Sequence, residues 1–171
     1  MGDIYNEQIV KKQASMKSTL TRVGIILSVV VIFFVCLSIP VIQTFAIIIA
    51  AAAAFGAYYL ISMLNIEYEY IFTNGELDID AIYSKSRRKR VFTGTVKDFD
   101  IVAHVSDAAH TRDFGGATET KDYSSGVVGN NTYAFLASYK GKRLKIIFEP
   151  NEKMIKAFSS VLTPRKFFKK L

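Results

Sequence analysis

A run without any Lys, Arg, Asp, Glu or His extends from Val23 to Ile66 and is rich in Ile, Val, Ala and Phe. One transmembrane helix takes about 20 apolar residues, so the run is too long for a single crossing and has the length of two. Backbone polar groups inside a bilayer need partners within their own segment, which predicts that both crossings are helical.

Pro40 and Gln43 interrupt this run. Because Pro lacks an N–H and resists the interior of a helix, we expect spans at 23–38 and 43–64 with a turn between them. This hairpin, 23–65, would be the membrane part of the chain. Two alternatives are a helix pair buried in a soluble core and a secretory signal peptide, although a signal peptide has one short apolar core rather than two long ones.

Basic residues set the expected orientation. Lys11, Lys12, Lys17 and Arg22 precede the first span, the turn between the spans carries no charge, and the region after the second span has a basic excess. Segments rich in Lys and Arg stay on the cytoplasmic side. We therefore expect a multi-pass protein of the cell membrane with both termini in the cytoplasm.

The N-terminal segment, 1–22, shows a helical pattern. At 100° per residue, Tyr5, Ile9, Met16 and Leu20 fall on one stripe, which predicts an amphipathic helix on the cytoplasmic side.

Small residues recur at helical spacing in both spans, where they let helix backbones approach closely. The candidate helix-packing residues are Gly24, Ser28, Ala50, Ala54, Gly56 and Ala57. They would pack within the hairpin or form an interface with other spans. Neither span holds an Asp, Glu, Lys, Arg or His, which disfavours a transporter or pump that works alone.

The region 66–171 begins with two alternating segments on either side of Asn74-Gly75, the strongest short signal for a β-hairpin. A two-residue turn there would pair Phe72 with Leu77 and Tyr70 with Ile79 on one face. The opposite face would carry acids, for which we expect basic partners from Lys89 and Arg90 of the next strand. The acids are Glu69, Asp78 and Asp80.

Further strands are predicted at 90–96, 99–105, 131–139 and 143–148. A C-terminal helix should follow, capped by Asn151 and ended by Pro164. The Gly- and Ser-rich stretch 106–130 is predicted to be a mobile loop with one short strand near 118–123. These elements form a cytoplasmic α+β domain, a bent antiparallel sheet or partly open barrel capped by a C-terminal helix.

This order of elements resembles the pleckstrin-homology-type (PH-like) domains of bacterial membrane proteins. The strings Tyr68-Glu69-Tyr70, Thr73-Asn74-Gly75-Glu76 and Phe148-Glu149-Pro150-Asn151-Glu152 also resemble small uncharacterised two-span membrane proteins of Gram-positive bacteria. The resemblance implies a membrane hairpin followed by a C-terminal PH-like domain, and it implies no activity.

A basic stretch after the second strand is the candidate site. Its residues are Lys85, Arg87, Arg88, Lys89 and Arg90. An out-and-back pair of strands returns this stretch toward the membrane, where each cation contributes about 1 kcal/mol against anionic lipid. The alternatives are a solvated turn that neutralises the acids of the neighbouring strands and a specific pocket for a phosphoinositide-like headgroup.

The sequence contains no recognisable motif for a metal site, a catalytic site or a nucleic-acid-binding site. His104, Asp107, His110 and Asp113 match no standard spacing for metal ligands, and no motif for a nucleophile, a phosphate loop or nucleic-acid binding is present. We expect no metal, no cofactor, no nucleic acid and no catalysis. The sequence favours a membrane-anchored binding or adaptor protein that engages anionic lipid and a protein partner. An accessory subunit of a larger transport-type complex, a homo-oligomer and a membrane-bound enzyme are the alternatives.

Overall fold

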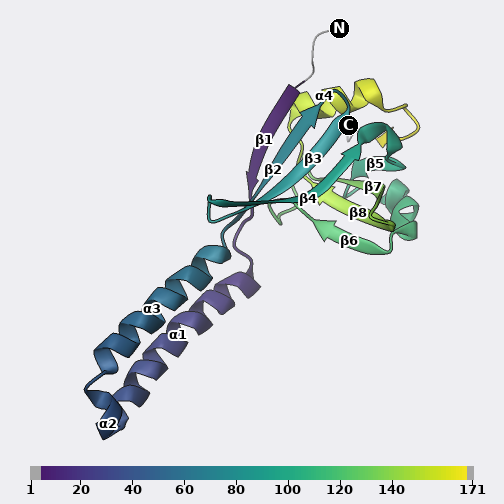
Figure 1. The fold of residues 1–171 in the computed structure, drawn as a ribbon. Helices are drawn as coiled ribbons and strands as arrows, with labels where there is room; N and C mark the ends of the chain where they lie inside the picture. Colours follow the sequence, from purple (N-terminus) through teal and green to yellow (C-terminus); the bar gives the residue numbers. More distant parts are fainter. Residues whose placement is uncertain (1–4, 169–171) are drawn as a thin grey trace. The chain divides into compact units, whose positions relative to one another are not determined.

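The computed structural model describes residues 5–168, which form two compact units. One unit, residues 14–66, is a pair of long helices, α1 (Met16–Ser38) and α3 (Ala46–Met63), joined by the short helix α2 (Pro40–Gln43) (Figure 1). Helix α1 begins earlier than 23 because the side chain of Ser15 accepts a hydrogen bond from the Ser18 N–H and caps it. The two predicted helices and the break at Pro40 are confirmed.

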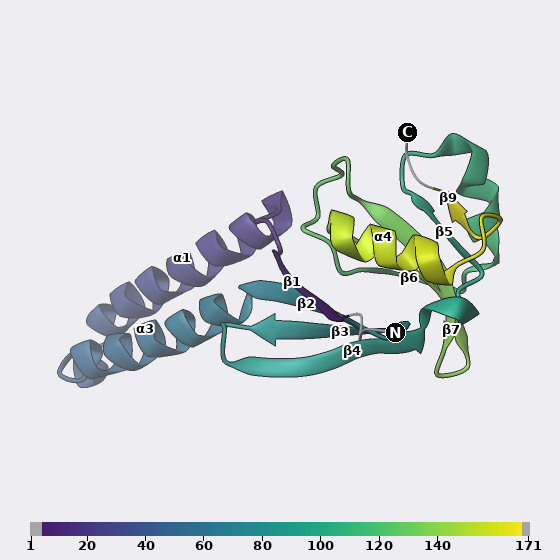
Figure 2. The same ribbon diagram turned by 90° about the horizontal axis from the view of Figure 1, so that it is seen from above.

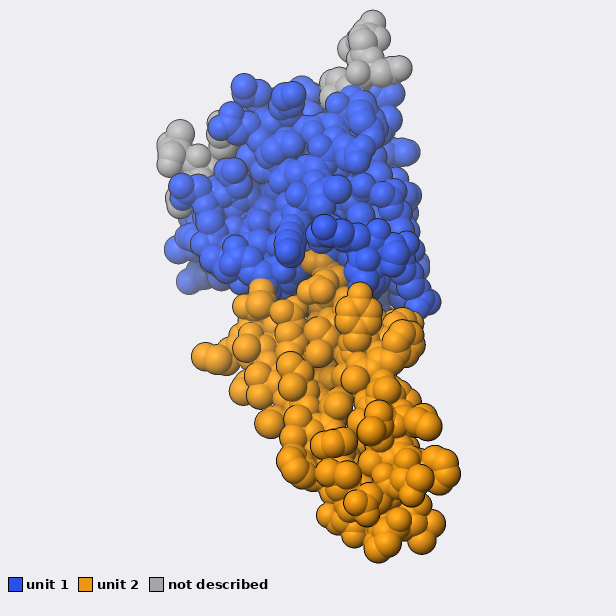
Figure 3. Space-filling view, turned by 90° about the vertical axis from the view of Figure 1, so that its left-hand side faces the viewer, with its two compact units in different colours: residues 1–13, 67–171 blue, residues 14–66 orange. Residues whose placement is uncertain are grey.

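The other unit comprises residues 5–13 and the described part of 67–171 (Figure 3). It contains two sheets. The first has the order β1-β2-β3-β4, and its strands are β1 (Tyr5–Lys11), β2 (Ile66–Thr73), β3 (Glu76–Tyr83) and β4 (Arg87–Thr95). Asn74 and Gly75 both have positive φ, 50° and 95°, as the predicted two-residue hairpin turn requires.

The predicted N-terminal amphipathic helix is wrong for residues 5–11, which form strand β1. This strand pairs antiparallel with β2, from Tyr5 opposite Thr73 to Lys11 opposite Glu67. Alternate side chains turn inward or outward, with Val10 buried and Ile9 exposed, which is the period of a strand. Pairing with a distant strand overrides the local helical pattern. The hairpin is therefore an insertion between two paired strands.

The second sheet has the order β6-β8-β7-β5-β9. Its strands are β5 (Ile101–His104), β6 (Glu119–Asp122), β7 (Tyr133–Tyr139), β8 (Lys142–Phe148) and β9 (Phe167–Phe168). The expected purely antiparallel sheet is wrong at both edges, because β6 pairs parallel with β8 and β9 pairs parallel with β5. The sequence pattern near each edge strand does not indicate which strand it pairs with or in which direction.

Helix α4 (Glu152–Val161) lies across the two sheets (Figure 2). The side chain of Asn151 accepts a hydrogen bond from the Met154 N–H, which confirms the predicted cap. On the buried face of α4, the Phe158 ring centroid lies 5.4 Å from that of Phe72 in β2 and 5.9 Å from that of Phe148 in β8. One aromatic side chain thus joins both sheets in a single core.

The stretch 106–130 is more structured than predicted. Strand β6 confirms the short strand predicted near 118–123, and a 3₁₀ helix that was not predicted, Ala108–Gly116, precedes it. Phe114 of the 3₁₀ helix is buried in a cluster with Ile101, Ala103 and Leu136, on β5 and β7 of the second sheet. The Gly and Ser content of the stretch predicts a loop, and the burial of one aromatic residue, Phe114, could not be recognised from that composition.

Candidate functional site

The basic stretch divides between a turn and a strand. Ser84 and Lys85 have positive φ, 51° and 57°, and they form the turn between β3 and β4. Strand β4 begins at Arg87 rather than at Arg90 as predicted. Successive residues on a strand point to opposite faces, so the cations from Arg87 onward alternate between the two faces of the sheet.

Two arginines of β4 cover the acids of the neighbouring strands. Nη2 of Arg88 lies 2.9 Å from the carboxylate of Glu69, whose side chain is 3% exposed. Nε of Arg90 lies 2.5 Å from Asp80, equally buried, and its Nη1 lies 2.6 Å from Asp78. We call these five side chains the acid–arginine ladder. It confirms that the next strand supplies the basic partners of these acids. The partners are Arg88 and Arg90, whereas Lys89 and Arg90 were expected.

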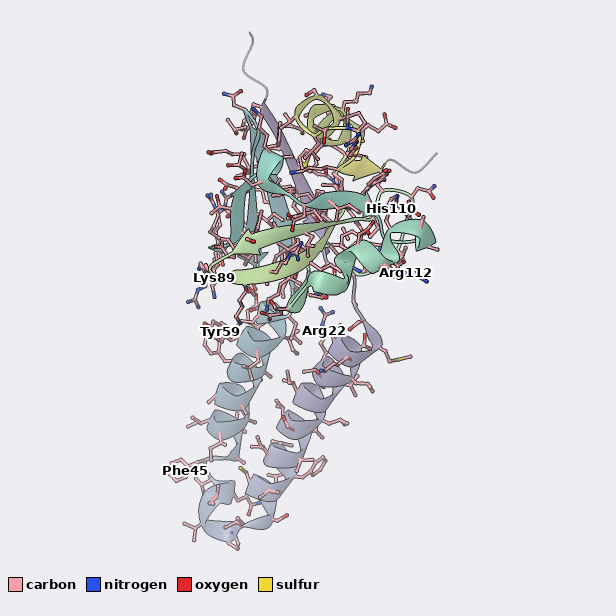
Figure 4. The ribbon with its side chains drawn as sticks, turned by 90° about the vertical axis from the view of Figure 1, so that its right-hand side faces the viewer. Arg22, Phe45, Tyr59, Lys89, His110 and Arg112 are labelled. Atoms are coloured by element: carbon pink, nitrogen blue, oxygen red, sulfur yellow. The ribbon has the colours of Figure 1, made fainter. Side chains whose placement is uncertain are left out.

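Three cations of the stretch stay outside the ladder. Lys85, Arg87 and Lys89 are exposed, and they form no ion pair with any described residue. Figure 4 shows Lys89 at the rim of the domain. This basic stretch thus contains two arginines that pair with acids and three cations that do not.

Two further lysines lie at the same end of the first sheet. Lys11 is the last residue of β1, opposite Glu67 at the start of β2. Nζ of Lys12 lies 5.7 Å above the ring of Tyr68 and 3.5 Å from its hydroxyl. Burial raises the pKa of Tyr68 to about 12, which keeps this hydroxyl neutral. We call the five cations the basic end: Lys11, Lys12, Lys85, Arg87 and Lys89.

A polar hollow of about 300 Å³ lies beside the loop between β6 and β7. The Gln13 N–H donates to the carbonyl of Ser125 at 2.7 Å, and the hydroxyl of Ser125 donates to Glu149 at 2.7 Å. Thr132 and Glu149 also line the hollow. The Glu149 carboxylate already accepts a hydrogen bond from the Ser125 hydroxyl of the loop. The sequence reasoning missed both the hollow and this loop contact.

The two histidines have structural partners. The His104 ring is buried between the Ser106 N–H, at 3.1 Å, and the Gly129 carbonyl, at 3.0 Å. His110, on the 3₁₀ helix (Figure 4), lies 2.9 Å from Asp113 and stacks on Phe168. The described residues contain no group of three potential metal ligands.

The candidate helix-packing residues fall into two sets within the hairpin unit. Ala50, Gly56 and Ala57 are half-buried. Gly24, Ser28 and Ala54 are exposed on the outside of the helix pair, and nothing lies within 4 Å of a Cβ built on Gly24. The exposed set does not serve packing inside the hairpin.

Comparison with known proteins identifies one family. The family model described as Bacterial PH-like domain (DUF6106) matches residues 2–169. The match takes in β1 and the helix pair as well as residues 66–169, so it is wider than the C-terminal domain that the sequence predicts. Neither the curated proteins nor the solved structures include a significant match.

Replacing a ladder arginine should destabilise the domain, whereas replacing a free cation should not. Arg88→Gln leaves the carboxylate of Glu69 buried without its guanidinium, which costs about 1–3 kcal/mol in the free energy of unfolding. Arg87→Gln, the neighbouring control, should change it by less than about 0.5 kcal/mol. Urea unfolding of the full chain in mild detergent, followed by the near-UV signal of its tyrosines, measures both. Equal effects would remove the distinction between ladder and free cations.

Stability should also depend on pH through Glu69. Burial raises the pKa of this carboxyl, Arg88 lowers it, and the nearby Glu7 and Asp80 raise it further, with a net upward direction. The contribution of Glu69 to the free energy of unfolding is therefore fully present below the ordinary pKa of Glu. It is lost as the pH rises through the raised pKa of the folded state.

Urea midpoints of the wild type and Glu69→Gln, compared between about pH 4 and about pH 7, test this direction. The wild type should lose stability relative to the variant as the pH rises. An Arg88→Gln background should enlarge the change, because it removes the one group that favours the charged form. A constant difference across the range would contradict the assignment.

Proposed function

Since the chain belongs to the Bacterial PH-like domain (DUF6106) family, we propose that it is a non-enzymatic, membrane-anchored binding protein. Its β domain docks on the anionic cytoplasmic leaflet of the cell membrane that its helix pair crosses. Two helices long and apolar enough to span a bilayer support the anchor, since only 6% of the most apolar window of each is buried. A helix pair in a soluble core would have these windows covered.

The distribution of charge on the domain carries this proposal. The ladder neutralises Arg88 and Arg90, and the free cations gather with Lys11 and Lys12 at one end of the first sheet. That end is where the chain enters and leaves the hairpin. Only residues 12–15 connect β1 to α1, and only Leu64 and Asn65 connect α3 to β2. Such short connections keep these cations near the headgroups.

Electrostatics then supplies the docking energy. Each Lys or Arg held close to an anionic leaflet contributes about 1 kcal/mol, and the attraction decays within a Debye length of roughly 10 Å. Because the hairpin already confines the domain to the surface, a few kcal/mol is enough to bias it toward a docked state. The distribution of basic residues also supports the topology with both termini in the cytoplasm.

The direct test measures the reactivity of lysines of the full chain in nanodiscs. Acylation of Lys85 and Lys89 should slow when the lipid is changed from zwitterionic to anionic, and it should recover at high salt. Lys97 is the internal control, since Val96 bonds to Gly75 at the other end of the sheet. Uniform rates at all three lysines would rule out docking through the basic end.

A pair of charge-matched variants sharpens this test. Arg87→Gln removes about 1 kcal/mol of attraction and should weaken docking about five-fold, which raises the reactivity of Lys85 and Lys89 in anionic nanodiscs. Arg165→Gln removes the same charge from an exposed position after α4 and should leave both rates unchanged.

A second candidate, an accessory subunit or homo-oligomer assembled through its spans, is supported by Gly24 and Ser28. These small residues lie four apart on the exposed side of α1, where helix backbones of another span could approach closely. The first proposal instead has a protein partner that binds the β domain. Such a partner should still co-purify when residues of the spans are substituted.

Purification from native membranes in mild detergent separates the two candidates. Gly24→Leu with Ser28→Leu should abolish co-purification, or reduce the oligomer to a monomer, if assembly runs through the spans. Val30→Leu, another exposed position of α1, is the matched control. A partner retained by the double variant would instead place the contact on the β domain.

A further inference from the structure

The loop between β6 and β7 carries two apolar side chains at its tip. Val127 and Val128 are 52% and 65% exposed, and glycines flank them at positions 126 and 129. Within the described part of the β domain, the other large apolar side chains that are exposed to this degree are Tyr5 and Ile9 of the edge strand β1. No charged residue occurs from Tyr123 to Thr132.

The loop is held at the basic end of the domain. The Tyr123 ring centroid lies 5.4 Å from that of Tyr68, which is the residue that contacts Lys12. The Tyr70 hydroxyl donates to the carbonyl of Tyr123 at 2.5 Å. The carbonyl of Ser125 accepts from Gln13, two residues before the cap of α1. These contacts tie the loop to the two strands from which the hairpin leaves.

The backbone of this loop finds hydrogen-bond partners within the loop itself. The Gly126 N–H donates to the hydroxyl of Ser124 at 3.0 Å, and the Val127 N–H donates to that of Ser125 at 3.3 Å. The Gly129 N–H donates to the hydroxyl of Thr132 at 2.8 Å. Amide groups that already have partners can enter a region poor in water at little cost, whereas free amides cannot.

We propose that Val127 and Val128 insert into the interfacial layer of the same membrane leaflet, as an apolar contact beside the basic end. The inference rests on the proposed membrane attachment and adds a second, uncharged mode of docking. Val128 is three residues beyond Ser125, whose carbonyl accepts a hydrogen bond from the Gln13 N–H. Only residues 14 and 15 separate Gln13 from the start of α1, so the chain itself ties this loop to the point where the helix pair begins.

Lipid is the occupant that the observations favour over a protein surface. Lys12 lies on Tyr68, the ring against which Tyr123 of the loop packs, and Lys17 and Arg22 follow the Gln13 contact along the chain. An uncharged apolar tip with a basic surround is complementary to a bilayer with anionic headgroups. Because the apolar contribution does not depend on lipid charge, it should persist where the electrostatic docking is screened.

The test places an environment-sensitive fluorophore on Val128→Cys in the full chain, in a Cys36→Ala background because Cys36 is the one cysteine of the sequence. In nanodiscs of zwitterionic lipid, a lipid-borne nitroxide near the headgroups should quench this label several-fold more than a label on Ser159→Cys. Ser159 is exposed on α4, close to Val161, which lies against Gly75 at the other end of the first sheet.

The outcomes separate this inference from electrostatic docking. In anionic nanodiscs, quenching at position 128 that persists at high salt, together with Lys85 and Lys89 that are unprotected even at low salt, would support the apolar contact and reject charge-driven docking. Protected lysines with a label at position 128 that only aqueous iodide quenches would overturn the insertion while leaving the docking intact. Quenching at position 128 no greater than at position 159 would likewise overturn it. Val127→Ser, combined with the label at position 128, should lower the quenching, because insertion involves both valines.

Discussion

The antiparallel pairing of β1 with β2 is the constraint on which the rest of the structure depends. Because Lys11 lies opposite Glu67, the chain leaves and re-enters the domain at neighbouring positions, and everything between them becomes an inserted hairpin. The same pairing brings Gln13 to Ser125. The backbone hydrogen bonds of this one strand pair therefore decide that the chain enters and leaves the hairpin at the same end of the first sheet.

Burial of acids explains why a compact basic cluster has two roles. Glu69 and Asp80 are almost fully buried, and an unpaired carboxylate in such a place is costly. Arg88 and Arg90 form ion pairs with these acids. Lys85 lies in the turn, and Arg87 and Lys89 point to the opposite face of the strand, so these three cations do not pair with the buried acids. Structural need, rather than total charge, determines which cations remain for a ligand.

Several features follow from local pattern alone. The uncharged run marks the two helices, Pro40 their break, Asn74-Gly75 the first turn and Asn151 the helix cap. Each depends on a few neighbouring residues with strong intrinsic preferences. The existence of an acid–arginine pair between neighbouring strands is equally predictable, because alternation puts like charges side by side and requires a counter-charge.

The sequence by itself determined the composition of the parts: two apolar helices, a β-rich domain with a C-terminal helix, and an excess of cations near the helices. Tertiary structure alone decided that residues 5–11 form a strand, that β6 and β9 pair parallel at the sheet edges, and that the loop carrying Val127 and Val128 is tied to Tyr68 and Gln13. Local preferences act over one or two turns of chain, whereas these features come from contacts between residues tens of positions apart. Such contacts form only when the whole core is buried at once.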